Sequence, residues 1–121
     1  TIQGWSSMSN EKTLRTLQRM IDRMERTLQY CQNESFASFQ SNLMLQEACV
    51  FNLLQIGELA HNGLDEAFVQ AHPEQPWRQI YGMRNRIAHD YEGFRLQIVW
   101  QTISEDFPLL IQDLKRLLAD L

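Results

Sequence analysis

The stretch LMLQEACVFNLLQIGELAH, residues 43–61, decides the fold. Between Leu43 and Gly57 it carries a single charge, Glu47, and its apolar residues recur at helical spacing. One face holds Leu45, Cys49, Leu53, Ile56 and Ala60, and Val50, Phe51 and Leu54 widen it. A helix this apolar lies at the centre of a bundle or at a subunit interface. Gly57 costs up to about 1 kcal/mol relative to alanine inside a helix, so we expect another helix to approach closely there.

Long amphipathic helices are predicted on both sides of this stretch. The first has Ser9 or Asn10 as its cap, and its apolar residues are Leu14, Leu17, Ile21, Met24, Leu28 and Cys31. The last runs to the end of the chain, with Leu96, Val99, Ile103, Phe107, Leu110, Leu114, Leu117 and Leu121 at heptad-like spacing. Pro108 removes a hydrogen bond to the Ser104 carbonyl, so a kink or split is expected there.

The remaining segments complete an all-α prediction. A helix entered at Pro76 carries an apolar stripe of Trp77, Ile80, Met83 and Ile87. Short helices fit the polar connection of residues 33–42 and the segment 64–71. We therefore predict an up-and-down helical bundle of four main helices plus short accessory helices.

Composition places few other limits on the chain. Its 121 residues suit one domain, predicted over residues 8–121, with residues 1–7 a remnant of an expression tag or a disordered arm. No run is long enough to cross a membrane and no signal peptide is visible, so we expect a cytoplasmic protein. Cys31 and Cys49 fall in apolar patterns and are expected to be buried and reduced. Their spacing from the histidines predicts no metal site, and we expect no cofactor.

Charge is distributed unevenly along the chain. The net charge is −4, residues 27–75 contain no Lys or Arg, and residues 76–95 carry a local charge of +2. This pattern favours a small anion site over a long nucleic-acid groove. Four arginines also follow the polar side of the first helix: Arg15, Arg19, Arg23 and Arg26. They are either a solvated face partly neutralised by Asp22 and Glu25, or a strip that contacts a nucleic-acid backbone.

The stretch MRNRIAHDYEG, residues 83–93, holds the chemistry that the rest of the chain lacks. Arg84 lies inside the apolar stripe of its helix, and an inward-facing guanidinium needs a partner. That partner is either an acid such as Glu58, which makes Arg84 structural, or an anion that the protein binds. His89 can act as a general base near neutral pH, and Tyr91 offers a hydroxyl. On an ideal helix Arg84 and His89 point about 140° apart, so the helix must end near His89 or a second chain must complete the site.

Arg84, His89 and Tyr91 together match the Arg-x4-His-x-Tyr signature, and the chain resembles the HepT-like toxin branch of the HEPN superfamily. The approach HPEQPWRQIYGMRNRIAHDYEG and the stretch LLQIGELA are also similar to that branch. The resemblance covers the chain from Met8 onward. It implies a HEPN-like bundle, a homodimer, and a partnership with a MntA-like minimal nucleotidyltransferase as antitoxin.

The same resemblance implies a metal-independent endoribonuclease toxin that cleaves RNA, such as tRNA or mRNA, by attack of a ribose 2′-hydroxyl. His89 would be the general base, Arg84 would hold the phosphate, and Asn85 would assist. Tyr91 would be the site of AMP addition by the antitoxin. Further RNA or nucleotide contacts are expected from three arginines near the motif: Arg78, Arg86 and Arg95.

Two alternatives remain open at this point. The first is a non-catalytic HEPN protein that only binds a nucleotide or the nucleotidyltransferase. The second is a helical bundle in which Arg84 and His89 are structural.

Overall fold

The computed structural model describes the backbone of residues 2–89 and 95–121, and the side chains of residues 10–85 and 95–121. Over these ranges the chain is helical, with no strand, which confirms the predicted all-α class. The helical segments are α1 (Ile2–Tyr30), α2 (Phe36–Gln40), α3 (Leu43–Gly63), α4 (Glu66–Ala71), α5 (Trp77–His89), α6 (Leu96–Gln101), the π-helix η1 (Thr102–Asp106) and α7 (Phe107–Ala119).

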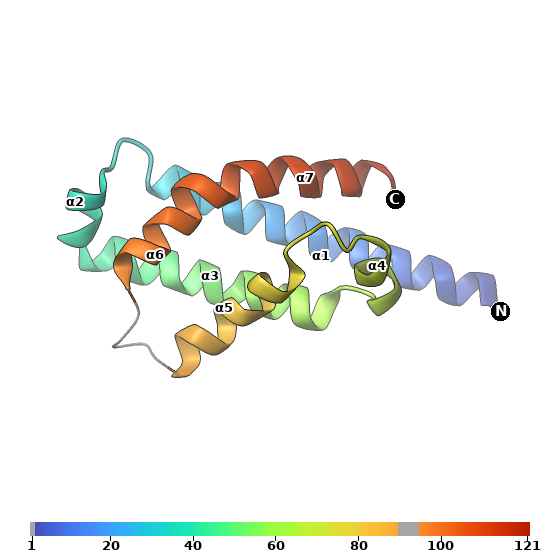
Figure 1. The fold of residues 1–121 in the computed structure, drawn as a ribbon. Coiled ribbons are helices and arrows are strands. Elements are labelled where there is room, and N and C mark those ends of the chain that lie inside the picture. Colours follow the sequence, from blue (N-terminus) through green and yellow to red (C-terminus); the bar gives the residue numbers. More distant parts are fainter. Residues whose placement is uncertain (1, 90–94) are drawn as a thin grey trace.

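The long helices run up and down, and the two ends of the chain lie at the same end of the bundle (Figure 1). α3 packs against α1 on one side and α5 on the other, while α7 covers α1. The short α2 and α4 cap opposite ends of α3. The apolar stretch that we placed at the centre of a bundle or at a subunit interface is therefore central in this chain.

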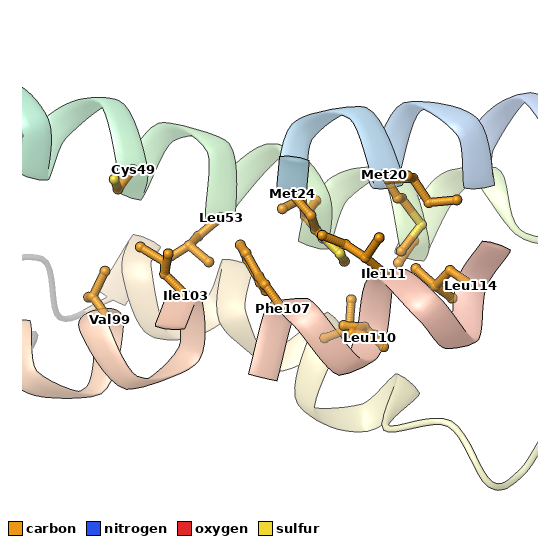
Figure 2. Packing of buried hydrophobic residues seen from close by; sticks show 14 of the residues in the cluster. Met20, Met24, Cys49, Leu53, Val99, Ile103, Phe107, Leu110, Ile111 and Leu114 are labelled. Carbon is orange, nitrogen blue, oxygen red and sulfur yellow. The ribbon is translucent and has the colours of Figure 1, made fainter. Parts of the chain in front are cut away.

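The core forms where α1, α3 and the C-terminal helices meet (Figure 2). Leu17, Met20 and Met24 of α1 and Leu114 of α7 are 0% exposed, and the ring of Phe107 points between the helices. Full burial of one such side chain stabilises the fold by about 1.5–3 kcal/mol. Most residues of the predicted apolar stripes thus form one continuous core. The prediction is wrong for Phe51 and Leu121, which are 52% and 42% exposed, and the side chain of Ile87 lies outside the described residues.

The start of α1 differs from the prediction. The helix begins at Ile2, so Ser9 and Asn10 lie inside it and neither is its cap. Ser and Asn are only mildly unfavourable in a helix interior, and a capping residue therefore does not force a helix to begin. That residues 1–7 lie outside the domain, as a tag remnant or a disordered arm, stays a prediction.

The C-terminal pattern is interrupted near Pro108, as predicted. Pro108 lacks the N–H that would continue an α-helical ladder, and the turn before it is the π-helix of residues 102–106. α7 then begins at Phe107, with Pro108 in its first turn. The wider turn divides the predicted helix into α6 and α7 while Ile103 and Phe107 both stay in the core.

Cys31 and Cys49 are buried free thiols, as predicted, and they lie against one another. Their Sγ atoms are 3.5 Å apart. The hydrogen bond with Cys31, together with burial, raises the pKa of the Cys49 thiol, which therefore stays protonated. The pair joins the end of α1 to the first half of α3.

None of the helices in the described ranges combines the length and the apolar character that a bilayer crossing requires.

Candidate functional site

α5 lies unusually close to α3 where Gly57 faces Arg84. A Cβ atom added to Gly57 would lie 3.2 Å from the Arg84 Cβ, from the Arg84 backbone nitrogen and from the Ile80 carbonyl oxygen. The absence of a side chain at Gly57 thus lets the backbone of α5 rest directly on α3. The close helix approach predicted from this glycine is confirmed, and it fixes the position of Arg84.

Arg84 forms an ion pair with Glu58, the next residue of α3. The prediction that its guanidinium faces inward is wrong, because the Arg84 side chain is 44% exposed and that of Glu58 is 34% exposed. Asn62 donates a hydrogen bond of 2.7 Å to the second oxygen of the same carboxylate. Glu58 is thus the partner that the sequence suggested. An exposed pair of this kind contributes only about 0–1 kcal/mol, so an incoming anion can compete for Arg84.

A pocket of about 380 Å³ opens beside this ion pair, between α1 and α3. It is lined by four residues of α1, three of which are cations, and by five residues of α3, three of which have polar side chains: Lys12, Arg15, Thr16, Arg19, Gln55, Glu58, Leu59, Asn62 and Gly63. Glu58 therefore belongs both to the pocket and to the contact with Arg84. Lys12 was not singled out in the sequence, although its spacing of three from Arg15 places it on the same helical face.

The four arginines of α1 divide into two pairs. Arg23 donates a hydrogen bond of 3.0 Å to the Asn52 side-chain oxygen and lies 5.5 Å from the centre of the Phe51 ring. Arg26 forms an ion pair of 2.8 Å with Asp22. Arg15 and Arg19 are exposed, and among the side chains that the structure describes neither has a carboxylate partner. Glu25 pairs with Lys115 and neutralises none of them.

His61 and Tyr81 lie at the same α3–α5 contact. Their rings meet edge to face with centroids 5.8 Å apart. Burial raises the pKa of the Tyr81 phenol above its usual value, so this hydroxyl stays neutral at cellular pH. Tyr81 therefore adds a hydrogen-bonding group and no charge.

A larger pocket of about 540 Å³ lies on the other side of α5, against α6, η1 and α7. Its floor includes Ile80 and Phe107, and its lining carries the carboxylates of Glu105, Asp106 and Asp113. Carboxylates repel phosphate, so this pocket is the less suitable of the two for a nucleic acid.

The other residues predicted for the site are only partly described. Asn85 is exposed one position after Arg84, Arg78 is exposed in the first turn of α5, and Arg95 is exposed just before α6. The side chains of Arg86 and His89, and the whole of Tyr91, lie outside the described residues. α5 ends at His89, so the first of the two conditions that the sequence set for Arg84 and His89 to act together is met, while the direction of the His89 side chain lies outside the described residues.

Comparison with known proteins gives a consistent family match. The family model for HepT-like proteins, described as "Ribonuclease HepT-like", matches residues 17–117. A "Putative RNase" of Caldanaerobacter subterraneus subsp. tengcongensis is 32% identical over 102 residues, which are 84% of this chain and 90% of the relative. A "Probable ribonuclease HepT" of Thermococcus cleftensis is 31% identical over 94 residues, 78% of this chain and 84% of the relative.

A more distant relative is a "Putative RNase" of Methanocaldococcus jannaschii, which is 25% identical over 102 residues, 84% of each chain. No solved structure gives a significant match.

Proposed function

The chain belongs to the HepT-like ribonuclease family, and on this premise we propose that it is a metal-independent endoribonuclease that acts as the toxin of a toxin–antitoxin pair. The main support for the proposal is the position of Arg84 on the surface. Its guanidinium is exposed beside a basic pocket, and its present partner is a weakly held surface carboxylate. A cation in that position is available to a phosphate of RNA.

The proposed reaction is an internal transfer at phosphorus. His89 removes the proton from a ribose 2′-hydroxyl, and the 2′-oxygen attacks the adjacent phosphorus. The bond from phosphorus to the 5′-oxygen breaks, which leaves a 2′,3′-cyclic phosphate and a 5′-hydroxyl end. Arg84 stabilises the charge that develops on the phosphoryl oxygens, and Asn85 adds a hydrogen bond. The leaving oxygen takes its proton from water or from a residue of a second subunit, because arginine cannot donate one.

The same proposal includes a homodimer. On an ideal helix positions 84 and 89 diverge by about 140°, so we infer that a second chain brings its His89 to the phosphate that Arg84 holds. In a symmetric dimer, Arg84 of one chain can face His89 of the other, and two equivalent sites then form. Mixing equal amounts of inactive R84A and H89A chains should therefore restore about a quarter of the wild-type activity, since half of the dimers are mixed and each has one intact site. No recovery after subunit exchange, verified by differently tagged chains, would contradict a shared site.

The reaction itself is tested by incubating the purified, unmodified chain with total RNA and defined tRNA in EDTA, beside H89A. We expect cleavage that persists in EDTA, leaves cyclic-phosphate ends and is lost in H89A. Intact RNA in every reaction, with Tyr91 shown by mass spectrometry to be unmodified, would favour a non-catalytic protein that binds nucleotide or nucleotidyltransferase. Cleavage that requires added Mg²⁺ would contradict the proposed chemistry.

Tyr91 is proposed as the silencing site. Its hydroxyl attacks the α-phosphorus of ATP in the active site of a cognate minimal nucleotidyltransferase, an AMP–tyrosine bond forms, and pyrophosphate leaves. The added phosphate places negative charge and bulk two residues from His89. Modified protein should lose RNA cleavage, whereas Y91F should keep cleavage and resist silencing. Full activity of a chain that carries AMP on Tyr91 would overturn this part of the proposal.

A further inference from the structure

We propose that the three cations of α1 that line the pocket, Lys12, Arg15 and Arg19, form a track for the backbone of single-stranded RNA that leads to Arg84. This inference rests on the proposed ribonuclease function and adds to it a substrate-binding surface outside the Arg-x4-His-x-Tyr motif.

Two of these cations are available to bind a phosphate. Arg15 and Arg19 are exposed and line the pocket, and no described side chain pairs with either. Arg23 and Arg26, on the next turns, are already used by Asn52 and Asp22. A phosphate that binds Arg15 or Arg19 therefore breaks no ion pair among the described side chains.

The pocket on α1 is connected to Arg84 through Glu58. Glu58 lines the same pocket and pairs with Arg84, so the α1 cations and Arg84 belong to one surface across α3. This surface carries one negative charge, on Glu58, and four positive charges, on Lys12, Arg15, Arg19 and Arg84. It is therefore positive, although the net charge of the whole chain is −4. The larger pocket, on the opposite side of α5, has three carboxylates and suits no polyanion.

The length of the row of cations indicates the class of ligand. Lys12, Arg15 and Arg19 lie at spacings of three and four on one helical face and span about 10 Å along α1. A single phosphate or one mononucleotide meets only part of such a row. Consecutive phosphates of an extended strand can meet each cation in turn, and contacts of this kind depend strongly on salt.

The test is binding of a fluorescent single-stranded RNA whose 2′-hydroxyls are methylated, so that it cannot be cleaved by the proposed reaction. Affinity is measured against salt for the wild type and R15Q/R19Q. We expect at least about tenfold weaker binding at 0.1 M salt, and a slope of log affinity against log salt reduced by about 1.4, the value for two lost phosphate contacts on a single strand. R15K/R19K keeps both charges and should restore most of the affinity.

The matched control is R26Q/R116Q, which removes the same two charges from residues paired with Asp22 and Asp113. We expect its affinity to stay within about threefold of the wild type, because surface charges away from the contact act only through a screened field. The track would be overturned if both double variants lost RNA affinity equally. It would also be overturned if R15Q/R19Q kept the wild-type affinity, with its helical content and melting temperature unchanged.

Kinetics separate this inference from the proposed function. If the wild type cleaves RNA, R15Q/R19Q should raise KM and leave kcat near its wild-type value, since the track binds ground state and transition state alike. Wild-type cleavage with an unchanged KM in R15Q/R19Q would overturn the track and keep the ribonuclease. If RNA binding depends on Arg15 and Arg19 but the wild type cleaves no RNA, the result would support the track and contradict the proposed ribonuclease activity.

Discussion

The two halves of the arginine strip on α1, Arg15 with Arg19 and Arg23 with Arg26, have similar helical spacing, four and three residues, and different structural roles. Arg15 and Arg19, in the first half, are exposed and line the pocket of about 380 Å³. Arg23, one turn later, reaches across to Asn52 and covers the Phe51 ring. The difference lies in α3, which presents polar and small residues to the first half and an amide beside an aromatic ring to the second. What a charged side chain does is thus decided by the helix opposite it.

Two threonines attach the first half of α1 to the end of α3 and to the residue before α4, so its cations are not needed for these contacts. Thr16 donates a hydrogen bond of 3.0 Å to the Gly63 carbonyl, and the Thr13 hydroxyl accepts one of 3.2 Å from the Asp65 backbone. Both threonines are buried. In the second half an arginine itself makes the contact between the helices.

The largest effect is expected where the small-residue contact is broken. In G63A the new Cβ would clash with the Thr16 hydroxyl oxygen and would lie 2.6 Å from its methyl carbon. Overpacking against a stiff threonine should lower the free energy of unfolding by about 3 kcal/mol, measured by urea denaturation. G82A is the matched control, because nothing lies within 4 Å of its added Cβ. It should gain about 0.5–1 kcal/mol, and a loss in G82A as large as in G63A would refute the packing argument.

A smaller effect is expected from R23A, which tests the structural half of the strip. Asn52 is 2% exposed, and its side-chain nitrogen has no hydrogen-bond partner among the described residues, so loss of Arg23 leaves both polar atoms of the buried amide without a described partner. We expect the free energy of unfolding to fall by about 1.5 kcal/mol. R15A is the comparison and should change it by less than about 0.5 kcal/mol. Equal losses in R15A and R23A would erase the distinction between the two halves.

The smallest effect is expected from R26A. Its ion pair with Asp22 links residues four apart on one helix, and both side chains are at least half exposed. Such a pair contributes about 0.3–0.5 kcal/mol and is screened by salt. Thermal unfolding of R26A at low and at high ionic strength should therefore differ little from the wild type. A loss above about 1 kcal/mol would show that Arg26 has a structural role like that of Arg23.

Much of the fold followed from the sequence because helix periodicity reports burial directly. The apolar face of residues 43–61 predicted the central helix, Gly57 predicted its close neighbour, and Pro108 predicted the division of the last helix. The π-helical turn before Pro108 was not predictable, because it depends on how the chain keeps both Ile103 and Phe107 in the core.

The site was less predictable, because exposure at a helix edge depends on the neighbouring helix. Arg84 lies between two apolar positions of α5, which suggested an inward guanidinium, yet the bare surface at Gly57 lets it extend along α3 to Glu58. Sequence spacing likewise did not separate Arg19 from Arg23, since the separation comes from residues of α3 distant in the chain. The roles of His89 and Tyr91 stay predictions.

The most direct test of the account is the single-turnover rate of RNA cleavage at saturating protein for the wild type and R84A. Saturation removes differences in binding, so the rate reports what Arg84 does for the reacting phosphate. We expect R84A to be slower by about 10²–10³, the usual cost of losing one group that stabilises developing charge. R116A, an exposed arginine on α7, should cleave at the wild-type rate. Cleavage by R84A at the wild-type rate would contradict the assignment of Arg84 to the scissile phosphate.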